Sequence, residues 1–141
     1  MPAWHDQFTT PDPDRLIGEI DPQHVPAHAA LIKRLDGLDH LSEELRWMGV
    51  PWRWTIAYRD GSRDVAFIIP DPGSPKLAIP IALDRIARLE SKKLPRTVRD
   101  GLAKARVVGE VAWAEWEIAS QAAATDLGKF LVKLERELAG V

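Results

Sequence analysis

Arginine and aromatic side chains alternate between positions 46 and 59, and these residue types suit the chemistry of a binding site. Arg46-Trp47 precedes Trp52-Arg53-Trp54, and Tyr58-Arg59 closes the segment. Indole and phenol rings can stack on a flat ligand, and a neighbouring guanidinium can hold its charge or stack in turn. The pattern is also typical of a closed aromatic core, so core and open cleft both remain interpretations. The candidate ligand-binding residues are Trp52, Arg53, Trp54, Tyr58, Arg59 and Trp113.

A basic band is the second candidate site. Residues 85–106 carry eight bases and two acids, whereas residues 1–44 carry nine acids and three bases. Bases spaced three and four apart share a helical face and could hold a phosphate-bearing metabolite or an acidic protein. Alternatively, the acidic segment 6–21 folds over the band, loosely held because exposed ion pairs contribute only about 0–1 kcal/mol each. The candidate anion-binding residues are Arg85, Arg88, Lys92, Arg96 and Arg99.

The sequence predicts no catalytic residues, no cofactor and no tight metal site. It has no cysteine, and its serines lie in none of the common nucleophile motifs. His24 and His28 have helical spacing, but Pro26 places His24 before the helix. Two alternatives remain: a small enzyme that uses a buried carboxylate such as Glu44 or Glu115, and a metal-handling protein. The metal hypothesis requires convergence of His24, His28, Asp36, Asp39 and His40.

Periodicity and turn residues predict the elements that position these side chains. Four prolines in residues 1–25 indicate an irregular N-terminal arm. Alternation of apolar residues and the hairpin signal Asp60-Gly61 predict strands over 44–48, 51–59, 63–69 and 76–82. Helices are predicted over 27–38, 83–90 and 95–106 and from Thr125 onward, and a strand over 107–119. The last helix presents an apolar stripe of Leu127, Phe130, Leu131, Leu134 and Leu138.

These elements predict a single α+β domain over residues 1–141. Its antiparallel sheet has about five strands, a meander over 44–82 plus the strand 107–119, with helices packed on one face. Strand periodicity places Trp52, Trp54, Ile56 and Tyr58 on one face of their strand. The odd offset between Trp113 and Trp116 directs these two side chains to opposite faces.

Composition restricts the class of protein. A hydrophobic content of 45%, a net charge of −2 and the absence of a signal-peptide pattern or long apolar run predict a soluble cytoplasmic protein with no membrane association. The near-neutral charge and the lack of recognition motifs disfavour nucleic acid. We therefore expect a binding module for an unknown small molecule or protein partner, with a homodimer left open.

Several landmarks resemble a bacterial domain-of-unknown-function family, the one numbered 3788. They are Leu45-Arg-Trp, Trp52-Arg-Trp-Thr, Ile68-Ile-Pro, Leu77-Ala-Ile-Pro-Ile, Leu94-Pro-Arg-Thr-Val-Arg-Asp and Trp113-x-x-Trp116, within residues 40–140. The resemblance implies a YdhG-like α+β domain, a group compared with frataxin and suggested to handle iron. Such a role requires an acidic ridge, for which the arm offers Asp12, Asp14, Glu19 and Asp21.

Overall fold

The computed structural model describes residues 2–139, with the side chains of residues 2–137, and shows an α+β fold. Its sheet has six strands in the order β1-β2-β3-β4-β6-β5, and every neighbouring pair is antiparallel. The strands are β1 Ser42–Trp47, β2 Trp54–Asp60, β3 Arg63–Ile69, β4 Lys76–Ala82, β5 Arg106–Val108 and β6 Val111–Glu117.

The predicted meander is confirmed, and the strand predicted over 107–119 is a hairpin. Gly61 takes a φ of 61° in the turn between β2 and β3, a conformation that glycine adopts without steric cost. Gly109 does the same with a φ of 63°, and the chain reverses there between β5 and β6. This second reversal adds the sixth strand to the predicted sheet of about five.

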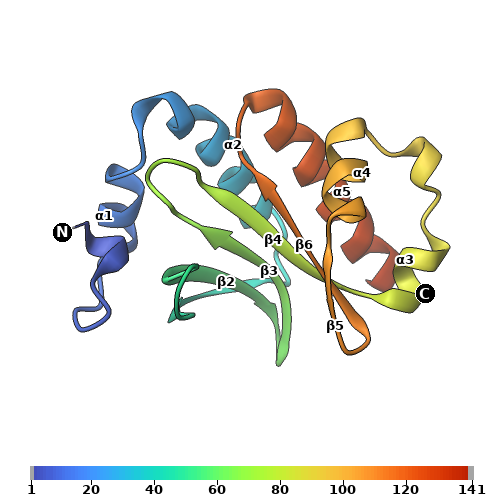
Figure 1. Ribbon diagram of the computed structural model, residues 1–141, viewed down its shortest axis with the longest axis horizontal. Helices are drawn as coiled ribbons and strands as arrows, with labels where there is room; N and C mark the ends of the chain where they lie inside the picture. The colour runs from blue at the N-terminus through green and yellow to red at the C-terminus, as the bar shows by residue number, and fades with distance from the viewer. Residues whose placement is uncertain (1, 140–141) are drawn as a thin grey trace.

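A layer of helices covers one face of the sheet (Figure 1). It contains α2 Val25–Asp36, α4 Arg96–Ala103 and α5 Gln121–Ala139, and the short α3 Leu83–Arg88 follows β4. The predicted stripe of α5 is buried at Leu127, Phe130, Leu131 and Leu134, whereas the side chain of Leu138 lies outside the described part. Among residues 2–139, no helix combines the length and apolarity that crossing a membrane requires.

Helix α4 is tied to the sheet through the indole of Trp116. Its Nε1 donates to the carbonyls of Thr97 and Val98, at 3.1 and 3.3 Å, in the first turn of α4. The next turn of α4 passes directly over the same ring at Gly101, whose lack of a side chain permits the approach. Trp116 therefore satisfies its own buried donor and sets the position of the helix.

The N-terminal arm covers part of the opposite face. It contains the short 3-10 turn η1 Ala3–His5 and helix α1 Pro13–Gly18, and Trp4 and Leu16 are buried in a second apolar cluster with Trp54 and Phe67. The arm lies at the end of the molecule remote from α3 and α4 (Figure 1). The hypothesis that the acidic arm neutralises the basic band is therefore wrong, because apolar burial holds the arm elsewhere.

The predicted common face of the aromatic strand is also wrong. Ile56 and Tyr58 pack in the apolar cluster between the sheet and the helix layer, which we call the helix-side cluster. Trp52 and Trp54 pack in the cluster that contains Trp4 and Leu16 of the arm, which we call the arm-side cluster. Arg53 has a φ of 58° just before β2, so regular alternation does not extend back to Trp52. Trp54 is the first residue of β2 and packs against the arm, where its Nε1 donates to the Asp6 carbonyl. The prediction for Trp113 and Trp116 is confirmed, because they belong to the arm-side and helix-side clusters respectively.

We expect Gly101→Ala to destabilise the fold, because the new methyl group would overlap the Trp116 indole. Overpacking of this kind costs about 1–3 kcal/mol. Urea denaturation of the purified variant measures the change. The matched control is Gly18→Ala, whose Cβ meets open space and should change the unfolding free energy by less than about 0.5 kcal/mol. Equal effects of the two substitutions would show that the α4–Trp116 contact is loose.

His28 should make stability depend on pH. It is 1% exposed, and burial lowers the pKa of His28 to about 4, below the ordinary value of about 6.5. Between these values the unfolded chain binds a proton that the folded chain excludes, so stability is full above about pH 6.5 and is lost towards pH 4. The total is on the order of 3 kcal/mol.

The comparison variant is His28→Leu, which removes this titration and retains an apolar side chain. We expect the unfolding free energy of the wild type, relative to the variant, to fall as the pH is lowered from 7 to 5. A difference that does not change over this range would mean that His28 titrates normally in the folded protein.

Candidate functional site

A cleft of about 600 Å³ lies on the arm side of the sheet, beyond the part that the arm covers. The loop between β1 and β2 supplies one wall, with Met48, Pro51 and Trp52. The β5–β6 hairpin and the residue after α4 supply the rest, with Lys104, Arg106, Val108, Trp113 and Glu115. We call this the aromatic cleft.

The position of the Trp52 indole depends on the sizes of four side chains that lie in one row across neighbouring strands of the sheet. The strand register places Ala57, Phe67, Ala78 and Glu115 side by side on β2, β3, β4 and β6. Side chains opposite one another in a sheet project from the same face. Because Ala78 has only a methyl group, the indole of Trp52 extends past it from Phe67 to Glu115, whose carboxylate accepts a hydrogen bond from Nε1 at 2.6 Å.

Two aromatic rings, Trp52 and Trp113, line the cleft, and the buried ring of Phe67 packs against both. Phe67 is buried at 1% exposure, and its ring centroid lies 5.4 Å from that of Trp52 and 5.8 Å from that of Trp113. The two indoles are half-buried, with centroids 6.0 Å apart and planes at 66°. Two partly open indole surfaces at a steep angle over an apolar base can hold a flat ring by stacking and edge contacts.

Two cations and one carboxylate define the charge of the cleft. Arg106 lies directly opposite Trp113 in the β5–β6 register, and Lys104 is also exposed in the lining. Within the described residues, neither cation forms an ion pair. One oxygen of Glu115 is engaged by Trp52. The cations are therefore available to a ligand, whereas Glu115 orients the indole.

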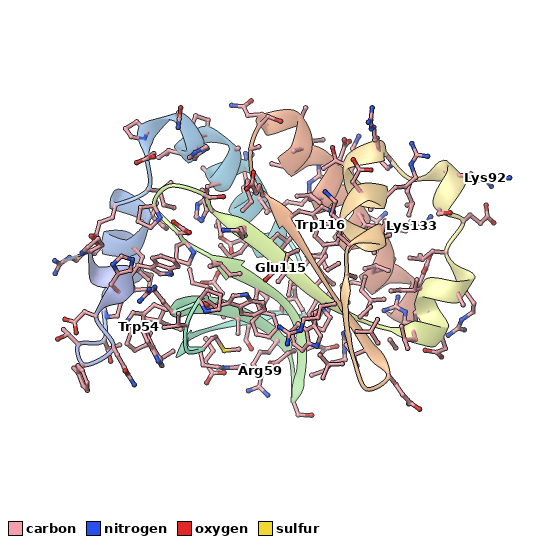
Figure 2. The ribbon with its side chains drawn as sticks, in the orientation of Figure 1. Trp54, Arg59, Lys92, Glu115, Trp116 and Lys133 are labelled. Carbon is pink, nitrogen blue, oxygen red and sulfur yellow. The ribbon has the colours of Figure 1, made fainter. Side chains whose placement is uncertain are left out.

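The structure separates the other predicted ligand-binding residues from this cleft. Trp54 is buried against the arm, with its Nε1 donating to the Asp6 carbonyl at 2.7 Å, and it lies far from Glu115 in Figure 2. Tyr58 is buried on the helix side, and burial raises the pKa of its hydroxyl. Arg53 and Arg59 also have other contacts.

These two arginines serve packing and the sheet edge. The Arg53 guanidinium lies 5.4 Å from the ring centroid of Trp4 in the arm. Arg59 pairs with Asp64 at 3.0 Å and with Glu44 at 3.4 Å. Of the predicted set, the structure therefore brings Trp52 and Trp113 together in the cleft. Sequence reasoning missed Lys104 and Arg106 as members of this site, although both belong to the basic segment.

The helical face predicted for Arg85, Arg88 and Lys92 of the basic band is not formed. Helix α3 ends at Arg88 and Lys92 lies in the separate turn η3 Ser91–Lys93, so the expected helical spacing of Arg85, Arg88 and Lys92 is broken. Arg85 donates to the Leu134 carbonyl at 2.8 Å. Arg88 pairs with Asp84, and Arg96 pairs with Asp100. Arg99 and Lys92 are exposed, and Lys92 is labelled in Figure 2.

The metal-ligating side chains that converge are partly different from those proposed. His40, Asp60 and Glu135 bring one ligand atom each within 4.8 Å of one another. Arg63 bridges two of them, with its Nη2 2.8 Å from Glu135 and 3.3 Å from Asp60, and His40 Nε2 lies 2.9 Å from Glu135. A guanidinium in this position already balances the buried carboxylate of Glu135, so the arrangement is better explained as an ion-pair network that joins the β2–β3 turn to α5.

The acids of the arm serve local structure. Asp12 caps α1 by accepting the Asp14 backbone N–H at 2.9 Å, and Glu19 accepts the Ala3 backbone N–H at 2.9 and 3.1 Å. Both contacts use carboxylate oxygens that an iron-binding ridge would need.

The carboxylate whose pKa is raised is neither of the two proposed for catalysis. Arg46 lowers the pKa of the exposed Glu44, and Glu115 lies in the open cleft. Instead, a hydrogen bond with Asp36 raises the pKa of Glu43 to about 7. Asp36 ends α2 and Glu43 lies on β1, opposite Tyr58. This pair depends on helix–strand packing, which no local sequence signal predicts.

Comparison of the chain with models of known protein families, with curated proteins and with solved structures finds no match. The resemblance to family 3788 therefore stays a prediction, and the cleft is interpreted from its own geometry.

We expect Glu115→Ala to release the Trp52 indole, because it removes the acceptor of the Nε1 hydrogen bond. The indole N–H signal of Trp52 should shift and exchange faster with water in a two-dimensional NMR spectrum. Glu115→Gln, which keeps an acceptor oxygen, should retain most of the protection. Glu117→Ala, on the same face of β6, is the matched control, and an equal change there would contradict the assignment of the bond to Glu115.

Proposed function

We propose that this protein is a binding module whose aromatic cleft takes a small, flat molecule that carries a negative charge. The observation that supports this most directly is the pair of half-exposed indoles, Trp52 and Trp113, above the buried ring of Phe67. Pockets that bind small molecules are mostly apolar with a few convergent polar groups, and this cleft has that composition.

The size of the cleft supports the same proposal. Its volume of about 600 Å³ lies within the range of about 300–1,000 Å³ that is usual for small-molecule sites. A flat ring stacked on the open surface of these indoles would lie beside Arg106 and Lys104, which line the same cleft. Arg106 would recognise a carboxylate or phosphate with two parallel hydrogen bonds, because its donors form a planar fork.

A set of three probes tests this proposal. Naphthalene-2-carboxylate combines a flat ring with a negative charge, naphthalene-2-carboxamide has the same shape without the charge, and cyclohexanecarboxylate has the charge without the flat ring. We expect the first to bind most tightly and each of the other two to bind at least about tenfold more weakly. The carboxamide loses a hydrogen bond between charged groups, which contributes about 1.5–3 kcal/mol, and the cyclohexane acid loses aromatic stacking, which contributes about 1–3 kcal/mol. Titrations followed by NMR signals of the indole N–H groups measure the three affinities.

Two variants assign the binding to the cleft. Trp113→Ala should abolish binding of the carboxylate. Arg106→Gln should reduce the preference for the carboxylate over the carboxamide, because Lys104 is then the one cation left in the lining described by the structure. Arg99→Gln, an exposed arginine outside the cleft lining, should leave all affinities unchanged. Binding of cyclohexanecarboxylate as tight as that of the naphthalene acid, or equal losses in Arg99→Gln and Arg106→Gln, would refute the proposal.

A further inference from the structure

A second, positively charged groove lies on the opposite side of the molecule, between α2 and α5. It has a volume of about 450 Å³ and is lined by Arg34 from α2 and by Lys129, Val132, Lys133, Arg136 and Glu137 from α5. A neighbouring hollow of about 380 Å³ includes Lys33, Ala30 and Thr125, and Arg34 lines both. The two hollows therefore adjoin along the helix pair, and we call them together the α2/α5 groove.

The spacing of the bases on α5 directs them into this groove. Lys129, Lys133 and Arg136 are four and three residues apart, so they project from one face of the helix. From Thr125 to Arg136 this face extends about 16 Å at 1.5 Å per residue. The cations are thus arranged in a line with Arg34 facing them from the other helix.

Gly128 fixes the position of Arg34. A Cβ at residue 128 would lie 2.9 Å from Cγ and 3.4 Å from Cβ of Arg34, so the stem of this arginine packs on the bare backbone of α5. Glycine within a helix is less favourable than alanine. Its presence inside α5 is explained by this close approach, which holds the Arg34 guanidinium at the groove.

The positive charge of the groove is not balanced by the described residues. Within residues 2–137, none of the bases Lys33, Arg34, Lys129, Lys133 and Arg136 forms an ion pair. The one acid in the lining, Glu137, pairs with Arg85 at 3.8 Å. Like charges at this spacing destabilise a helix, and a bound anion would remove that repulsion.

We propose that the α2/α5 groove binds a ligand with several linked phosphate groups, such as a short polyphosphate chain. Two arginines with planar donor forks and three lysines provide the donors that phosphate oxygens prefer. The lining contains no aromatic side chain, so it offers no platform for the base stacking of single-stranded nucleic acid. The linear arrangement and the two adjoining hollows fit a chain of charges better than a single phosphate.

The test uses inorganic tripolyphosphate as the probe and isothermal titration calorimetry at low salt. We expect tripolyphosphate to bind at least about tenfold more tightly than orthophosphate, with an affinity that decreases as salt increases. The double variant Arg34→Gln/Lys133→Gln should weaken binding of tripolyphosphate about tenfold or more. The control Arg96→Gln/Arg99→Gln removes the same charge from α4 and should change the affinity less than about twofold.

Gly128→Ala supplies a test that leaves the net charge unchanged. The added methyl group displaces the stem of Arg34, so binding of tripolyphosphate should weaken while circular dichroism shows an unchanged helical content. Undiminished binding in Gly128→Ala would refute the role assigned to Arg34.

Three further outcomes overturn the proposal itself. Equal losses in the two double variants would show that tripolyphosphate senses only the net charge. Tighter binding of a ten-residue poly-glutamate peptide, lost in Arg34→Gln/Lys133→Gln, would identify an acidic peptide as the ligand class. Tighter binding of a mixed-sequence DNA duplex with the same loss would identify nucleic acid. Each outcome is independent of the aromatic cleft, because the two sites share no residue.

Discussion

The structure depends on one constraint: the central strands of the sheet are apolar on both faces, so both faces must be covered. On β4, Leu77, Ile79 and Ile81 face the helices, whereas Ala78 faces the other side. The helices supply a continuous layer for the first face. The second face has no such layer and is covered by the short N-terminal arm and by three indoles in and beside the β1–β2 loop, those of Trp47, Trp52 and Trp54. Because this second cover is incomplete, the sheet is closed over β2 and β3 and open over β5 and β6, where the aromatic cleft lies.

Side-chain size then determines where each ring goes. The methyl group of Ala78 leaves space for Trp52 to extend past β4, and the absence of a side chain at Gly101 leaves space for Trp116 beneath α4. Both indoles find hydrogen-bond acceptors, but with different consequences. Trp116 is buried and bonds to backbone carbonyls, so its role is structural. Trp52 remains half-exposed and bonds to a side chain at the surface, so one side of its ring stays accessible to a ligand.

The sequence predicts most elements, because alternation and turn signals are local properties. Asp60-Gly61 and the apolar residues around it were sufficient to predict β2 and β3. The site was predicted less well, because its members meet only through the order of the strands. Trp52 and Glu115 are 63 positions apart, and no local pattern indicates that Ala78 lies between them. The position of Trp52 differs from the prediction because the unusual backbone of Arg53 interrupts the alternation. Trp54 follows Arg53 within β2 and differs because it packs against the arm, which no strand pattern indicates. The α2/α5 groove was missed because its cations lie on two helices about 100 residues apart and were not counted together.

The position of the N-terminal arm is determined by apolar burial and not by its acidic charge, from which contact with the basic band was predicted. Ion pairs at the surface contribute about 0–1 kcal/mol each, and on that basis an acidic arm would be loosely held. Burial of one tryptophan removes about 150–250 Å² from water, which corresponds to an upper bound of about 4–6 kcal/mol at 25 cal/mol per Å². Trp4 is 6% exposed, and its Nε1 donates to the Trp52 carbonyl at 3.0 Å. Apolar burial therefore exceeds the electrostatic contribution several-fold and fixes the arm on the loop that carries Trp52. Because Trp52 forms a wall of the cleft, the arm positions the candidate site although no residue of the arm lines it.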